Sequence, residues 1–184
     1  MWPLRYVKPP EALGYILKPS GRVGQVAAKV EFTNFVCTSF DKEFGDFEYC
    51  YLKSVNRTYK YMSTKFNLYQ APIKKIKVNI SLHKRFSGYR PFMYNVTVDG
   101  CRFLNNPKSN PVILFFYNII TSFSNINHSC PFNDAVIMEK IPTTTFNHHF
   151  SSVLPFPEGD YMLQIVWIAY DINRAVTKLY FTLS

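Results

Sequence analysis

The sequence predicts a mainly β protein with one inserted amphipathic helix. Phe, Trp and Tyr make up 17% of its 184 residues, and aromatic side chains mixed with Val, Ile and Thr favour strands over helices. Apolar and polar residues alternate in two long segments, as in strands with one buried face and one wet face. With 47% hydrophobic residues, the chain is long enough for one domain with a sizeable core and too short for two large ones.

Residues 1–27 differ in composition from the rest of the chain. They are rich in proline and glycine and contain no strand-like run, so we expect an irregular leader outside the fold, followed by one β-sandwich domain over residues 28–184. The expected strands cover residues 31–39, 47–55, 58–69, 73–82, 91–104, 146–154, 161–170 and 175–183.

Two predicted strands show the alternation most clearly. Successive side chains of a strand point to opposite faces, so each apolar row is predicted to face the interior of the sandwich. In 73–82 the apolar row is Ile76, Val78, Ile80 and Leu82, and the polar row is Lys75, Lys77, Asn79 and Ser81. In 91–104 the rows are Phe92, Tyr94, Val96 and Val98 against Met93, Asn95, Thr97 and Asp99.

One helix is predicted between residues 110 and 124. Asn110 suits the N-cap and Pro111 the first helical position. A bulky apolar stripe follows at helical spacing, made of Val112, Phe115, Phe116, Ile119, Ile120 and Phe123. Two interpretations remain open: the helix covers the sandwich core, or it stands at the mouth of a hydrophobic cavity.

The four cysteines are predicted to form two disulfide bonds. They are Cys37, Cys50, Cys101 and Cys130, with no CxxC pair of the kind found in zinc sites. Of the three possible connectivities, we favour Cys37–Cys50 and Cys101–Cys130, which close the shortest loops. The second bond would pin both ends of the helical segment.

Four N-x-S/T sequons predict a secreted glycoprotein. The acceptors are Asn56, Asn79, Asn95 and Asn127, and Asn79 and Asn95 fall on the polar sides of their strands. Residues 1–10 contain no apolar signal segment. We therefore expect that the start of this chain is faulty or that its signal was replaced or trimmed, with a cytosolic protein as the less favoured alternative.

The charged residues point to no particular partner. The formal net charge of +9 is spread along the chain, and its strongest cluster is Lys74, Lys75 and Lys77. We interpret this cluster as a solvated strand face, with an anionic lipid head group or cell surface as the alternative. Nucleic acid is not expected as a partner, because no recognition helix, zinc finger or RNA-binding signature is present.

The titratable residues form no known catalytic motif. His148 and His149 are adjacent and would point to opposite faces of a strand. The carboxylates of residues 41–48 are interpreted as a solvated acidic turn, with a calcium site as the less favoured alternative. We therefore expect no enzyme, no cofactor and no metal. An undetected hydrolase would need one of the histidines, His83, His128, His148 or His149, beside a nucleophile in a pocket.

Seven short strings together resemble the insect family called domain of unknown function 1091, over residues 29–184. They are VEFTNFVC at 30–37, FEYC at 47–50, KSVNRTY at 53–59, NPKSNP at 106–111, NINHSCP at 125–131, LPFPEGDY at 154–161 and YDINR at 170–174. That family resembles a distant branch of the lipid-recognition superfamily of myeloid differentiation factor and the ganglioside activator, on the basis of the turn before Tyr161.

The resemblance implies an immunoglobulin-like two-sheet sandwich that holds a lipid between its sheets. The implied function is a secreted binding protein for a hydrophobic small molecule or lipid in insect chemosensation, with a membrane receptor as a partner. The alternative is an extracellular protein-interaction module with a solid core. Two departures concern the cavity: no cysteine follows Cys130, and the helical insert 110–124 is longer than is usual in the lipid binders.

The candidate cavity residues come from the inward rows of the strands and from the helix stripe. They are Ile76, Val78, Ile80, Phe92, Tyr94, Val96, Phe115, Phe116, Ile119, Phe123, Ile165 and Trp167.

Overall fold

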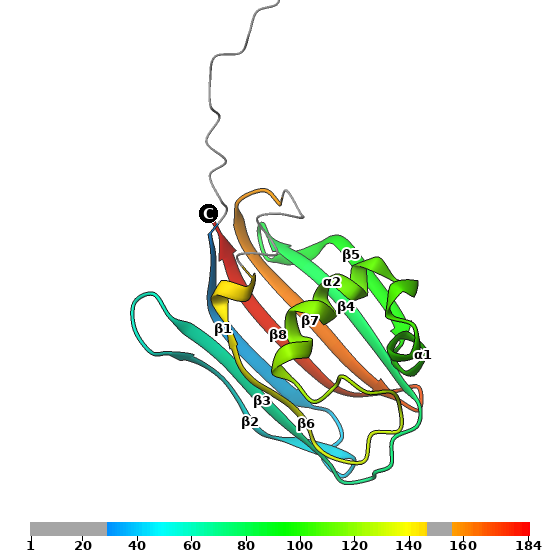
Figure 1. The fold of residues 1–184 in the computed structure, drawn as a ribbon. Helices are drawn as coiled ribbons and strands as arrows, with labels where there is room; N and C mark the ends of the chain where they lie inside the picture. The colour runs from blue at the N-terminus through cyan, green and yellow to red at the C-terminus, as the bar shows by residue number, and fades with distance from the viewer. Residues whose placement is uncertain (1–28, 147–155) are drawn as a thin grey trace, which may run out of the picture.

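Two antiparallel sheets face each other in the computed structural model, which describes residues 29–146 and 156–184 (Figure 1). The expected leader at 1–27, most of the strand expected at 146–154, and His148 and His149 lie outside the described residues. The larger sheet has the order β1 (Val30–Ser39), β8 (Ile172–Leu183), β7 (Gly159–Ala169), β4 (Ile76–Arg85) and β5 (Tyr89–Asp99). The smaller sheet has the order β2 (Gly45–Ser54), β3 (Lys60–Leu68) and β6 (Val136–Pro142). The predicted mainly β sandwich is confirmed.

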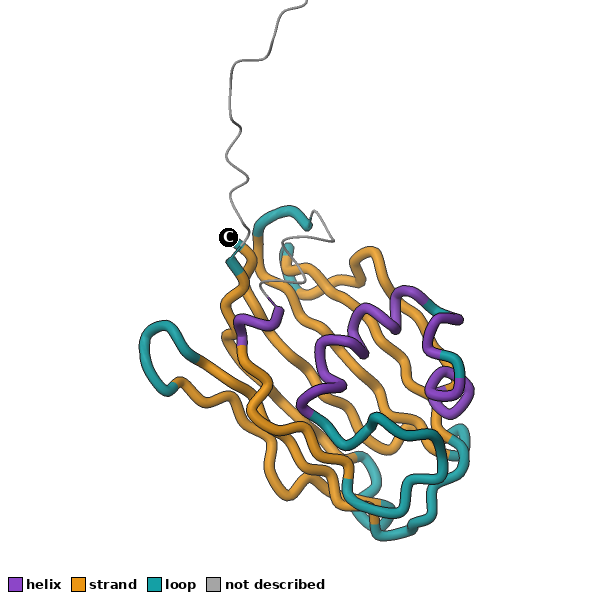
Figure 2. The backbone as a smooth tube through the Cα atoms, in the orientation of Figure 1, coloured by secondary structure: helices purple, strands orange, loops and turns teal. Residues whose placement is uncertain are grey.

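Helices complete the layer that the smaller sheet begins. Between β5 and β6 the chain forms α1 (Gly100–Asn105), η1 (Pro107–Ser109), α2 (Pro111–Ile120) and η2 (Thr121–Phe123). Figure 2 shows α2 on the same side of the larger sheet as the three-stranded sheet, beside it rather than behind it. The inner face of the larger sheet is therefore covered partly by strands and partly by a helix.

The start of α2 follows the sequence prediction. Asn110 Oδ1 accepts a hydrogen bond from the Ile113 backbone N–H at 3.1 Å, and Pro111 occupies the first turn. The cap satisfies a donor that the helix itself cannot pair. The helix ends at Ile120 and continues as the short 3₁₀ turn, close to the predicted bounds.

The strand predicted at 91–104 is wrong beyond Asp99. The Asp99 side chain accepts a hydrogen bond from the Arg102 backbone N–H at 2.9 Å and so caps α1. Gly100 packs against Ile76, where a Cβ atom would lie 3.4 Å from the Ile76 side chain. Asp followed by Gly is turn chemistry, and it ends the strand although apolar residues continue after it.

The sequence analysis missed β6. Its alternation is broken because Lys140 has a positive φ of 50°, and the Lys140 N–H bonds to the Ser63 side chain at 2.8 Å rather than to a strand partner. An irregular edge strand of this kind lacks the period-two signal by which strands are recognised.

The main core joins both sheets and α2. Phe32 from β1, Leu82 from β4 and Ile119 from α2 are almost fully buried in it, as is Tyr161 from β7. The apolar rows predicted for β4 and β5 belong to this core or pack on it, except for Ile76, which packs on a smaller cluster around Ile73. Ser81 was predicted on a wet face but is only 4% exposed, and its hydroxyl lies 3.1 Å from His83 Nε2.

Both predicted disulfide bonds are present. Cys37–Cys50 joins β1 to β2, the neighbouring edge strands of the two sheets. Cys101–Cys130 joins α1 to the loop before β6 and so closes the helical insert. The Cys37–Cys50 bond therefore links the larger sheet to the layer that covers it, and the Cys101–Cys130 bond links two parts of that covering layer.

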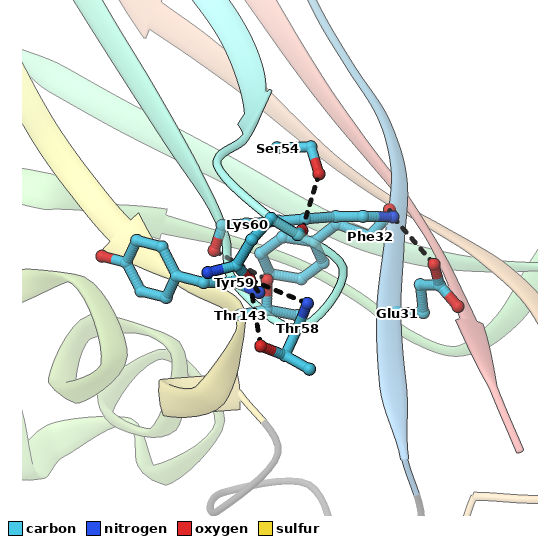
Figure 3. Close-up of polar contacts among 8 residues, drawn as sticks. Glu31, Phe32, Ser54, Thr58, Tyr59, Lys60 and Thr143 are labelled. Atoms are coloured by element: carbon cyan, nitrogen blue, oxygen red, sulfur yellow. Dashed lines mark hydrogen bonds and ion pairs between the residues drawn. The ribbon is translucent and has the colours of Figure 1, made fainter.

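Lys60 adds a polar bridge between the sheets (Figure 3). From the start of β3 its ammonium donates to Glu31 Oε1 at 2.8 Å and to the Phe32 carbonyl at 3.2 Å, both in β1. The Thr143 hydroxyl, which follows β6, donates to the Lys60 carbonyl at 2.9 Å. The hydrogen bond and the charge of Lys60 lower the pKa of Glu31.

We expect the Cys101–Cys130 bond to stabilise the fold more than the Cys37–Cys50 bond. The bonded cysteines are 29 and 13 residues apart. Loop-closure entropy then gives about 3 kcal/mol for each bond, with the longer loop ahead by about 0.7 kcal/mol. The free energies of unfolding of the two paired Cys→Ala variants, measured in urea, test this order. A larger loss for the Cys37/Cys50 pair would contradict it.

Candidate functional site

A cavity of about 150 Å³ lies between the larger sheet and the mixed layer that covers it. The larger sheet supplies Ile76, Val78, Ile80, Val98, Leu163, Ile165, Trp167, Thr177 and Leu179. The helical insert supplies Gly100, Phe103, Leu104, Ile113, Phe116, Tyr117 and Ile120. Met62 and Met138 close it from the smaller sheet. An engineered protein cavity of about this volume stays dry and binds benzene.

The walls of this cavity offer a ligand few polar groups. Among the described residues that line it there is no Asp, Glu, Lys, Arg or His. The Thr177 hydroxyl accepts from Trp167 Nε1 at 3.3 Å, and the Tyr117 hydroxyl donates to the Ile126 carbonyl at 3.5 Å. These polar groups have protein partners, so the cavity suits a ligand that buries hydrocarbon.

A second, smaller cavity of about 70 Å³ adjoins the first. Five residues line both: Ile76, Val136, Met138, Trp167 and Thr177. Its remaining walls are mainly aromatic and aliphatic, with Phe44, Phe47, Phe66, Leu68 and Ile73 among them. The two spaces are thus separated by a shared row of side chains.

Arg174 from β8 stands in the wall of the second cavity. One guanidinium N–H donates to Asp41 Oδ2, and Nε donates to the Ala169 carbonyl at 3.4 Å. The guanidinium carbon lies 4.2 Å from the centre of the Phe44 ring, and the side chain is 12% exposed. A cation this far out of water is retained because it is paired and stacked on an aromatic face.

The structure brings together half of the candidate cavity residues. Ile76, Val78, Ile80, Phe116, Ile165 and Trp167 line the larger cavity. Phe92, Tyr94, Val96, Phe115, Ile119 and Phe123 lie elsewhere in or against the main core. Phe92 and Tyr94 pack on Phe156, with ring centres 6.5 and 6.4 Å apart, so they fill the end of the sandwich instead of lining a space.

Two residues of the predicted helix stripe, Phe116 and Ile120, line the larger cavity. The residues of α2 that line the cavity are Ile113, Phe116, Tyr117 and Ile120, which lie on one face at spacings of three, four and seven. Residues 112–117 are all apolar or aromatic, so periodicity alone could not choose between this face and the neighbouring one. Met62 and Met138 also line the cavity, but they lie on strands distant in sequence from α2, and no local sequence pattern identified them as cavity residues.

The predicted acceptor asparagines lie at the surface or half-buried. Asn56, Asn95 and Asn127 are exposed, and Asn79 is half-buried. Asn56 organises the β2–β3 hairpin: its Oδ1 accepts from the Thr58 N–H, the Thr58 hydroxyl and the Tyr59 N–H at 2.8–3.0 Å. Asn79 Nδ2 instead donates to Asn95 Oδ1 at 2.9 Å and to Thr97 Oγ1 at 2.8 Å.

The charged clusters found in the sequence form surface ion pairs. Lys75 and Lys77 both bond to Asp171 and lower the pKa of that carboxyl to about 2. In the acidic segment, Asp46 pairs with Lys42, and Glu48 pairs with Lys65. No group of three or more His, Cys, Asp or Glu residues that could hold a metal ion occurs in the described part of the chain.

One serine–histidine contact bears on the hydrolase hypothesis. Ser81 Oγ and His83 Nε2 are within hydrogen-bond reach, but neither residue lines either cavity. Burial, followed by the nearby charge of Lys178, lowers the pKa of His83. The pair has the contact that a nucleophile needs but stands outside both apolar cavities.

In the described residues, no helix has the length and apolar character required to cross a membrane.

Comparison with protein families gives a match over the middle of the chain. No curated protein matches the chain. Residues 78–163 match the family model described as "Protein of unknown function (DUF1091)". The matched segment runs from Val78 in β4 to Leu163 in β7 and includes the whole helical insert, so it carries much of the wall of the larger cavity. The match supports the predicted resemblance to the DUF1091 family of proteins of unknown function over these residues.

Proposed function

We propose that this protein is a secreted binding protein for a hydrophobic small molecule or lipid, held between the two layers of the sandwich. The observation that carries the proposal is the apolar cavity of about 150 Å³. An empty cavity costs about 24 cal/mol per Å³, which amounts to about 3.6 kcal/mol here. A protein whose only requirement was a stable core would gain by filling this space.

The volume of the larger cavity limits the affinity that a ligand confined to it can reach. A cavity that accommodates a benzene-sized group holds about six carbons. At about 0.8 kcal/mol per buried CH₂, these contribute about 5 kcal/mol, equivalent to a dissociation constant of about 0.2 mM before entropic costs. Tighter binding requires a ligand that extends beyond the larger cavity.

Secretion and glycosylation belong to the same proposal. Two disulfide bonds suit an oxidising compartment. Three of the four acceptor asparagines are exposed, and the hydrogen bonds that organise the Asn56 hairpin use its Oδ1. A glycan attached to Asn56 Nδ2 would therefore leave these bonds in place.

A role in insect chemosensation, with a membrane receptor as partner, follows from the family resemblance alone. The alternative of a solid interaction module is less well supported, because the interior contains a cavity. One surface does suit a protein partner. On the smaller sheet the rings follow in the order Tyr49, Tyr51, Tyr61 and Tyr59, with successive ring centres 5.8–6.4 Å apart. Tyr51 and Tyr59 are exposed, and Tyr61 is buried between them. Tyrosine is enriched in protein interfaces.

Filling the cavity is expected to abolish ligand binding. We expect benzene to raise the melting temperature of the natural protein, because a ligand that binds only the folded state stabilises it. Ile165→Phe places a ring in the cavity and should eliminate the shift. Val166→Phe is the matched control, because the neighbouring side chain of β7 points to the opposite face and lines neither cavity. Equal shifts in both variants, or no shift in the natural protein, would count against the proposal.

Secreted protein from insect cells should lose mass on treatment with peptide N-glycosidase. Thr58→Ala removes the Asn56 sequon and should reduce that loss by one glycan, whereas Thr58→Ser retains both the sequon and the hydroxyl. Mass spectrometry of the three proteins checks this. An unchanged mass after glycosidase treatment of the natural protein would refute glycosylation.

A further inference from the structure

The two cavities are close enough to serve one ligand. Met138 and Trp167 are the largest of the five side chains that line both spaces. Methionine is unbranched and has three rotatable side-chain bonds, so a change of its rotamers opens a passage without movement of the backbone. A narrow, flexible chain would pass this point more readily than a rigid ring system.

The second cavity offers a polar group that the first one lacks. Among the described residues that line either cavity, Arg174 is the one with a charged side chain. A guanidinium group carries five N–H donors in a fixed fork, and the bonds to Asp41 and Ala169 use two of them. In the described part of the chain, the other three have no recorded acceptor.

We infer that the ligand is an elongated aliphatic chain with one uncharged oxygen at its end, and that this oxygen accepts a hydrogen bond from Arg174. The inference rests on the proposed function and names the class of ligand for the same site. The chain fills the larger cavity, passes Met138 and Trp167, and ends in the smaller one. Alcohols, aldehydes and esters have the required chemistry.

The charge balance at Arg174 excludes a carboxylate as the preferred end group. Asp41 already neutralises the guanidinium. A second carboxylate would face the like charge of Asp41 and would be buried without a counter-ion of its own, which is costly in an apolar interior. An uncharged oxygen gains the hydrogen bond without adding a charge. A hydrogen bond to a charged donor is worth about tenfold or more in affinity.

Binding of octane, octanol and octanoate to the full chain tests this assignment, with Trp167 fluorescence as the readout and Trp2→Phe as the background. The key variant is Asp41→Asn with Arg174→Met, which removes both charges and keeps an apolar chain in place of the guanidinium. We expect octanol to lose about tenfold in affinity in this variant, and octane to change by less than about twofold. Equal changes for octanol and octane would overturn the role of Arg174.

Asp41→Asn alone provides a second measurement in which Arg174 is retained. Octanoate should then bind about tenfold or more tightly than it binds the natural protein, because the guanidinium is no longer neutralised. Unchanged octanoate affinity would show that Arg174 does not face the ligand. Affinity should also rise by about fourfold for each CH₂ from butanol to octanol. A plateau at hexanol would overturn occupation of both cavities.

The benzene-induced shift in melting temperature separates this inference from the proposed function. Benzene fits the larger cavity alone, and neither Asp41 nor Arg174 lines that cavity. The shift should therefore persist in both variants, which also shows that they are folded. Its absence from the natural protein would remove the proposed function. A normal shift combined with the contrary octanol or octanoate results would remove only the assignment of the chain ligand to Arg174.

Discussion

The larger sheet presents an inner face that the smaller sheet is too narrow to cover. Five strands stand against three, and an apolar sheet face must be buried against another layer. The helical insert between β5 and β6 covers the remainder. A helix and a sheet that share one layer cannot interdigitate with the opposite sheet as evenly as two matched sheets do. The larger cavity lies where the helical insert and the smaller sheet meet above the larger sheet.

The covalent and polar ties stand around this junction. Cys37–Cys50 holds the two sheets together along the β1 and β2 edges, while Cys101–Cys130 anchors the helical insert on the other side. Arg174 and Asp41 link β8 to the turn after β1 beside the smaller cavity. These ties fix the elements that surround the cavities, so that space between them can persist without collapse of the layers onto each other.

The two cavities differ in polarity, so a long ligand would bind in one orientation. The larger one is lined by side chains whose few polar groups bond within the protein, and the smaller one contains a nearly buried guanidinium. A long ligand would therefore be oriented by its end group rather than by its chain. The segment that matches the DUF1091 family model supplies the helical insert and most of β4, whereas Arg174 lies outside it. The family segment thus builds the apolar space, and a later strand supplies the polar end.

Local sequence patterns were enough to predict the β class, the apolar rows of β4 and β5, the capped start of α2 and both disulfide pairs. These are local features: strand alternation, a cap three residues from its donor, and the shortest loops between cysteines. The face of α2 that lines the cavity could not be predicted in this way, because residues 112–117 are apolar on every side and packing against the sheets selects the face. The same holds for the pairing of β6 despite the positive φ of Lys140, and for the contacts of Arg174 with Phe44 and Asp41. Each of these depends on contacts between segments far apart in the chain, which no local pattern encodes.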